Sequence, residues 1–416
     1  MVQFRHQDNA HWYHETQRSG NAEHLTAAPV HEPDPAHQGH IHLTQDQQTH
    51  DKQIQDSDNV TDENIFLLGL AEEIPASLNN SLQHHAPLFA ASDAMYRALF
   101  PAIVTPDHSS TFSLYDRLSS ALTVAQVTGI QRLCSHYAAR LTPLPSPDAS
   151  RESNMRLTQM TQYARQLASQ PTLIDRHALQ QLVEVGLTQT DIIVLSQIIG
   201  FVGYQARVVS GISAQAEYPT VMLPGFPRME DAPAGQLPRV DAQWQGGLPG
   251  LVADTALAEH GVAVKTELTL NQLLAQHLPS LPAYSAITAW LHNPLAAIPA
   301  DWQAWVSLVS ARINGSLYCQ AQHRHSLQQQ AGNASLLAAL QLGVAGALAT
   351  SPKAQLSHPL IYISAELTRA PERFNHQHIS PLLALGVSHQ QLLGIILSTA
   401  TAGWVNRLRH SLGQTN

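Results

Sequence analysis

Two 50-residue segments of this chain align without a gap at a constant offset of 200 residues. The first covers residues 163–212 and the second covers residues 363–412. The positions that they share are Leu167/Leu367, Pro171/Pro371, Leu182/Leu382, Gly186/Gly386, Gly203/Gly403 and Arg207/Arg407. A common helical period would match apolar residues alone, whereas this alignment also matches a proline, two glycines and an arginine. We therefore predict that the chain contains a tandem duplication.

Each copy is predicted to form three helices. The first ends before the shared proline, the second ends at a glycine that suits a helix C-cap, and the third is long. Upstream of each trio we predict another long apolar helix, over residues 113–141 and residues 301–327. Arg207 and Arg407 fall near the C-terminal ends of the third helices, where a cation can bond the last carbonyls. We interpret them as capping residues rather than as contacts to an acidic substrate.

The predicted fold class is all-α, with two similar helical units in tandem. From about residue 65, apolar residues recur three and four positions apart, and no segment shows the alternation of a strand. Changes in composition give the boundaries. The four parts are a His-rich polar segment (1–62), a first unit (63–213), a Pro/Gly-rich connector (214–262) and a second unit (263–416).

The N-terminal segment carries nine of the 24 histidines and too few apolar residues to bury a core, so we predict a solvated tail. His37, His40 and His42 could bind zinc or nickel weakly, but composition favours the solvated tail. His323 and His325 lie two positions apart, so on a helix they point to different faces and form a poor chelating pair. We predict neither a metal site nor a cofactor.

The charge balance argues against two classes of partner. The net charge is −9 and no dense run of lysine or arginine occurs, which disfavours nucleic acid and anionic membranes. The most apolar run, residues 192–212, contains Gln197, Gln205 and Arg207, so it is predicted to be a buried helix and not a membrane span. Only two cysteines and no signal-peptide pattern favour a cytoplasmic protein without disulfides.

The stretch NGSLYCQAQHRH, residues 314–325, contains the candidate reactive group. Cys319 and His323 are four residues apart, so they share a helix face and the imidazole could lower the pKa of the thiol. A thiolate formed in this way is a nucleophile for a peroxide oxygen or another electrophile. The alternative is a buried cysteine packed beside a histidine, since free cysteine is among the most buried residue types. The sequence leaves both interpretations open.

Three segments give the chain a resemblance to the carboxymuconolactone decarboxylase and AhpD-like alkylhydroperoxidase superfamily. They read NGSLYCQAQH, ELTRAPERFNHQHISPLLALG and TAGWVNRLRHSLG, and the resemblance covers residues 65–212 and 265–416. The peroxidase branch carries a glutamate followed by CxxCxxxH. In this chain the second cysteine and the histidine match Cys319 and His323, while Ser316 replaces the first cysteine and Ala304 the glutamate.

The resemblance implies a thiol-dependent oxidoreductase that reduces a peroxide or another small electrophile. Cys319 would be the nucleophile, His323 its base and Ser316 a polar neighbour. Because Ser316 cannot form the family's redox disulfide, the oxidised cysteine would need a small thiol or a partner protein as reductant. The family also implies a homo-oligomer.

Two other functions remain open. The missing cysteine and glutamate fit a catalytically degenerate assembly or small-molecule-binding protein. The superfamily also includes decarboxylase and isomerase chemistry on small carboxylates, for which no residues can be placed here.

In the first unit, Leu133 and Tyr137 occupy the positions of the motif cysteine and histidine, and Cys134 and His136 are displaced by one residue from those positions. We expect that unit to be a scaffold.

Overall fold

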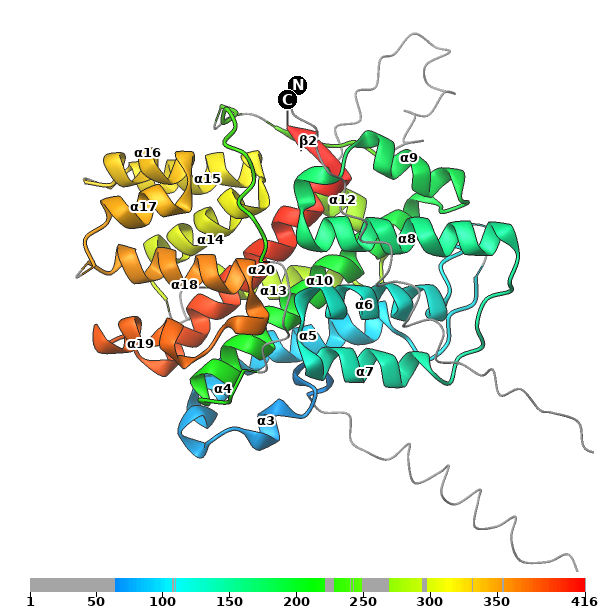
Figure 1. Cartoon of the computed structure of the whole chain (residues 1–416), viewed down its shortest axis with the longest axis horizontal. Helices are drawn as coiled ribbons and strands as arrows, with labels where there is room; N and C mark the ends of the chain where they lie inside the picture. The colour runs from blue at the N-terminus through cyan, green and yellow to red at the C-terminus, as the bar shows by residue number, and fades with distance from the viewer. Residues whose placement is uncertain are drawn as a thin grey trace, which may run out of the picture. The chain divides into compact units, whose positions relative to one another are not determined.

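The computed structural model describes residues 64–106, 108, 110–220, 228–239, 241, 243–248, 269–293, 298–330, 332–353 and 355–415. Of these described residues, 71% are helical and 2% are in strands, which confirms the all-α class (Figure 1). The predicted tail, residues 1–62, lies outside the described residues, and so does part of the connector. The described residues belong to one compact unit that runs from Asp62 to Asn416.

The elements of the first half end with the longest helix of the described chain. They are η1 (Ile65–Leu67), α3 (Leu70–Glu73), η2 (Ala76–Leu78), α4 (Asn79–His84), α5 (Ala86–Leu99), α6 (Leu114–Thr128), α7 (Gln131–Leu141), α8 (Arg151–Ser169), η3 (Pro171–Leu173), α9 (Arg176–Glu184) and α10 (Gln189–Gln215).

The second half ends in a similar trio. Its helices are α12 (Leu270–Leu274), α13 (Leu281–Leu291), α14 (Ala300–Asn314), α15 (Leu317–Gln328), α16 (Ala334–Leu342), α17 (Val344–Thr350), α18 (Ser357–Arg369), η4 (Pro371–Arg373), α19 (His376–Ala384) and α20 (His389–Leu412). The starts of η4, α19 and α20 lie 200 residues after those of η3, α9 and α10.

Two predictions about local structure are wrong. The segments 113–141 and 301–327 are each two helices, because Gly129 and Gly315 adopt the left-handed conformation, with φ 70° and 78°, and end the first helix of each pair. Two short strands also occur, although none was predicted. β1 (Trp244–Gly246) pairs antiparallel with β2 (Gly413–Thr415), and three residues are too few to show an alternating pattern.

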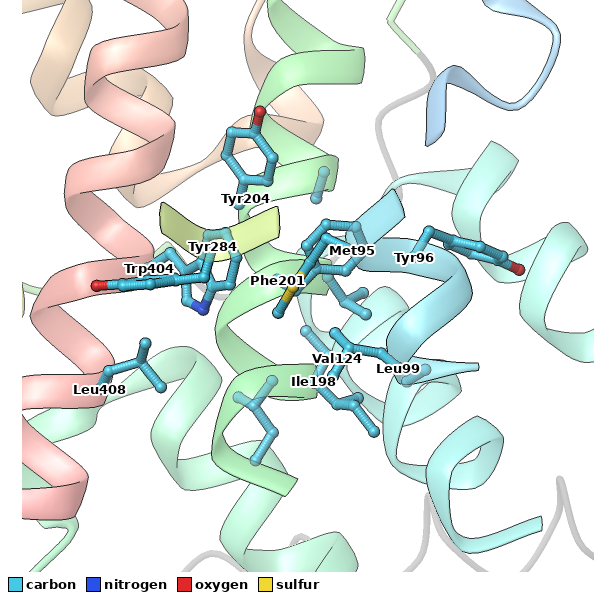
Figure 2. Close-up of a cluster of buried hydrophobic side chains, with 14 of the residues drawn as sticks. Met95, Tyr96, Leu99, Val124, Ile198, Phe201, Tyr204, Tyr284, Trp404 and Leu408 are labelled. Atoms are coloured by element: carbon cyan, nitrogen blue, oxygen red, sulfur yellow. The ribbon is translucent and has the colours of Figure 1, made fainter. Parts of the chain in front are cut away.

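Helices α10 and α20 pack closely against one another through small residues. A Cβ on Gly200 would lie 2.1 Å from the Trp404 ring, and one on Gly211 would lie 2.4 Å from Ile396. Tyr204 of α10 stacks on the Trp404 ring with centroids 5.6 Å apart. Figure 2 shows this aromatic cluster continuing from α20 across α10 towards the side chains of α5. The crossing therefore forms the centre of the core.

Two buried arginines exchange hydrogen bonds between the halves. The Arg207 guanidinium donates to the carbonyl of Thr368, at the end of α18, and to Gly203 of its own helix. Arg407 donates to the carbonyls of Leu167 and Ala168, at the end of α8, and to Gly403. Both residues cap carbonyls, as predicted, but the helix ends that they cap belong to the other half.

Helix α10 is the one described helix that is long and apolar enough to cross a membrane. Its most apolar window is entirely buried inside the protein, against neighbours that include α6 and α20. The prediction of a buried helix over residues 192–212 is therefore confirmed, and such burial is typical of a core helix in a soluble protein.

Replacing Gly200 with alanine tests the close packing of α10 on α20. The new methyl group would overlap a buried indole ring, so we expect the free energy of unfolding to fall by about 1–3 kcal/mol. Gly346→Ala on α17 is the matched control, because its Cβ would lie 3.5 Å from the carbonyl oxygen of Ala339 on α16, which is an ordinary contact. Urea denaturation of both variants measures the difference. Equal stability of Gly200→Ala and the parent protein would contradict this packing.

Candidate functional site

Cys319 lies in the first turn of α15, directly after the turn at Gly315. Ser316 is the N-cap residue and is buried, and its backbone N–H donates to the carbonyl of Ala311 at 3.0 Å. Cys319 itself is only 5% exposed. Ala304, at the position that the family resemblance gives to glutamate, is a buried methyl group on α14. The candidate nucleophile is therefore covered by protein in this conformation.

The pKa of the Cys319 thiol is raised above its ordinary value. Burial is the largest cause, because it penalises the thiolate. The positive charge of Arg409 and a hydrogen bond with Ser316 act in the opposite direction but do not overcome burial. The thiol is thus protonated at neutral pH, in contrast to the lowered pKa that the sequence led us to expect.

His323 follows one turn later on the same helix and is half-buried. Burial lowers its pKa to about 4, and the charges of His292 and Arg409 act in the same direction. The imidazole is therefore neutral at pH 7. Within the described residues, no hydrogen bond joins Cys319 to His323, so the helix brings the two side chains to one face without pairing them.

Arg409 of α20 completes the site and was not predicted. Its guanidinium lies 4.5 Å from the centroid of the Tyr318 ring and 5.5 Å from that of Trp244. Trp244 is fixed in turn, because its indole N–H donates to the backbone carbonyl of Arg409 at 2.8 Å. The residue 200 positions before Arg409 is Val209, so the first half has no arginine at the corresponding position. This difference was the only feature of the sequence that could have identified Arg409 as a site residue.

Tyr284 of α13 shows how close these groups lie. It is buried, and burial raises the pKa of its hydroxyl to about 12, with smaller effects from Arg409 and Cys319. Its ring also packs edge-on against Trp404 of the core, at a centroid distance of 5.3 Å. The site therefore combines a thiol, an imidazole, a guanidinium and a phenol from α13, α15 and α20.

The corresponding region of the first half fills the core. Leu133 and Tyr137 are completely buried, and the Tyr137 hydroxyl donates to the Gln205 side chain at 2.7 Å. Burial raises the pKa of Cys134 to about 11. The Nε2 atom of His136 lies 2.6 Å from the Tyr96 hydroxyl. These contacts agree with the expectation of a scaffold.

No group of three or more potential metal ligands occurs in the part of the chain that the structure describes. His325 is exposed on α15, and His37, His40 and His42 lie outside the described residues.

Comparison with known proteins adds no family assignment. No protein-family model matches the chain, and no curated protein matches it. The resemblance to the AhpD-like superfamily therefore stays a prediction based on the motif residues.

The raised thiol pKa predicts slow alkylation of Cys319 at neutral pH. In a Cys134→Ser background, the rate with iodoacetamide should keep rising above pH 9, because only the thiolate reacts. Mass spectrometry of quenched samples gives the modified fraction. A rate that levels off near pH 7 would show that the thiol is acidic and contradict this electrostatic account.

Three histidines predict a loss of stability in acid. Burial lowers the pKa of His85, His277 and His323 to about 4, against 6.5 ordinarily. Between these values the unfolded chain binds more protons than the folded chain, so the free energy of unfolding should decrease as the pH falls from 6.5 towards 4. Urea midpoints at pH 7 and pH 5 measure the decrease. The slope of the unfolding free energy against pH counts the protons taken up on unfolding, and each single His→Gln variant should lower that number by up to one. An unchanged slope in all three variants would refute the prediction.

Proposed function

We propose that this protein is a cytoplasmic thiol-dependent oxidoreductase related to the AhpD-like alkylhydroperoxidases, with Cys319 as its single reacting thiol. The observation that carries the proposal is the position of Cys319 in the first turn of α15, one turn before His323 and near enough to Arg409 for that charge to act on the thiol. A cation and a neutral imidazole beside a thiol are the groups that thiolate chemistry uses.

A tandem duplication of AhpD-like units accounts for the architecture. Paired helices α6–α7 and α14–α15 each divide at a left-handed glycine, and each half closes with a short 3₁₀ turn, a short helix and a long helix. Thr188 and Ser388 cap α10 and α20 with the same reciprocal side-chain bonds. These correspondences support the duplication, in which α16 and α17 are additions to the second unit. We also propose that the chain forms a homo-oligomer.

The proposed reaction has two steps. Cys319 gives its proton to His323, the thiolate attacks one oxygen of a hydroperoxide, and the O–O bond breaks. The sulfur becomes a cysteine sulfenic acid, and the released alkoxide takes the proton from His323 to become an alcohol. Two molecules of a small thiol then reduce the sulfenic acid, which yields the free cysteine, a disulfide of the small thiol and water. The second step is intermolecular because the neighbouring motif position is Ser316.

Hydration of the site would prepare it for this reaction. Burial is the largest cause of both the raised thiol pKa and the lowered imidazole pKa. When water or substrate enters, the desolvation penalty decreases, so the two pKa values move towards each other. His323 then becomes a better acceptor for the proton that Cys319 releases.

A catalytically degenerate binding or assembly protein is the second candidate, and one observation favours it. The thiol is 5% exposed and protonated, and Ala304 supplies no carboxylate to relay a proton. The same fold could then retain its helical framework without redox chemistry.

A peroxide assay separates the two functions. In a Cys134→Ser background that leaves one thiol, we expect turnover of an organic hydroperoxide with a dithiol as reductant. Cys319→Ser should reduce the rate to that of buffer, and His323→Gln should reduce it by roughly 100-fold, as loss of a general base does. The parent protein with both cysteines is the control for the background. Turnover that does not differ between the Cys319→Ser variant and its background would favour the degenerate protein.

A further inference from the structure

Arg409 differs from the other buried or partly buried arginines of α10 and α20 in the hydrogen-bond partners of its guanidinium. Arg207 and Arg407 direct their N–H groups at backbone carbonyls. Among the described residues, by contrast, no ion pair or side-chain hydrogen bond involves the Arg409 guanidinium, which is half-buried. A guanidinium presents five donors, so most of its hydrogen-bonding capacity remains available to a ligand.

The aromatic neighbours of Arg409 hold it in place. Tyr318 and Trp244 contact the guanidinium at 4.5 and 5.5 Å from their ring centroids. Rings of this kind stack on the face of the planar cation and leave its N–H edge free for a planar, bidentate partner such as a carboxylate. Trp244 is anchored by its indole hydrogen bond and by the pairing of β1 with β2. The binding group is therefore ordered before any ligand arrives, which lowers the entropic cost of binding.

The charge around Arg409 favours an anion. The imidazole of His323, whose pKa burial lowers to about 4, is neutral at pH 7, so the positive charge here is that of the Arg409 guanidinium. None of the carboxylates in the described part of the chain forms an ion pair with Arg409, His323 or His292. A ligand carboxylate would neutralise a cation that now lacks a partner, and charge-assisted bonds of this type are among the strongest in proteins.

The position of Arg409 connects this anion site to the thiol. Its guanidinium lies against the ring of Tyr318, the residue before Cys319 on α15, and its charge is near enough to act on Cys319 and Tyr284. A small organic acid bound there would place an electrophilic group a few bonds from its carboxylate near the sulfur. Orientation of a reacting group by remote binding is a common source of rate enhancement.

We infer that Arg409 binds the carboxylate of a small organic acid and thereby presents the rest of that molecule to Cys319. The role of this acid as substrate rests on the proposed function, whereas its binding does not. Arg409 is thus a binding residue for substrate, and the substrate class is a small carboxylate that carries a peroxide or another electrophilic group.

Calorimetry with benzoate as the probe tests the binding, and benzamide is the neutral control of the same shape. We expect the full-length protein to bind benzoate and not benzamide. Arg409→Gln should weaken benzoate binding by at least about tenfold, as expected for loss of a charged hydrogen bond. Arg409→Lys keeps the positive charge but lacks the paired N–H donors of a guanidinium, so this variant should bind benzoate with intermediate affinity. Arg239→Gln is the matched control, because Arg239 is exposed and paired with Asp241 at 3.0 Å.

Cys319→Ser separates this inference from the proposed function. Benzoate should bind this variant as it binds the parent, even though peroxide turnover is lost. Equal binding of benzoate and benzamide by the parent protein, or unchanged benzoate affinity in both Arg409 variants, would overturn the inference while leaving thiol turnover intact. Benzoate binding that depends on Arg409, without any Cys319-dependent turnover, would instead support the anion site and reject the oxidoreductase.

Discussion

The reciprocal hydrogen bonds of Arg207 and Arg407 are the constraint on which the rest of the structure depends. Each arginine enters from one half and satisfies carbonyls at the C-terminal end of a helix in the other half. Burial of a guanidinium is costly, and it lowers the pKa of Arg207 to about 10 and the pKa of Arg407 well below its ordinary value. Carbonyls at a helix C-terminus carry partial negative charge and offset this cost. Neither half can therefore satisfy its own buried helix ends without the other.

The same constraint determines where the candidate site forms. Arg407 and the Trp404 ring fix the rotation of α20 about its axis, since both are buried in the core. Arg409 follows two residues later, so it projects about 200° around the helix from Arg407. That direction leads to Tyr318 of α15 and to Trp244 of β1. One helix thus supplies a structural arginine to the interface between the halves and a second arginine, without a carboxylate partner, to the thiol.

The sequence predicted local structure better than it predicted the site. The all-α class and the burial of α10 follow from apolar spacing, but the helices were expected to continue through Gly129 and Gly315, where a left-handed glycine divides them. The spacing of Cys319 and His323 predicted a shared face correctly. It did not predict how deeply that face is buried, and burial determines the direction of both pKa shifts. Arg409 escaped prediction because its partner Trp244 lies 165 positions away in a connector that has no periodic pattern.

Access to the site and the reactivity of its thiol both depend on how deeply Cys319 is buried. Under the proposed function, a sulfenic acid at Cys319 would need a thiol that enters from solvent, because Ser316 stands where the family motif has its second cysteine. Entry of that thiol, or of a substrate, requires that Cys319 lose part of its cover. Loss of cover lowers the desolvation penalty on the thiolate, so the opening that admits a reactant also lowers the thiol pKa. A single-cysteine site of this design would remain unreactive while closed, and burial would then be a means of controlling the nucleophile.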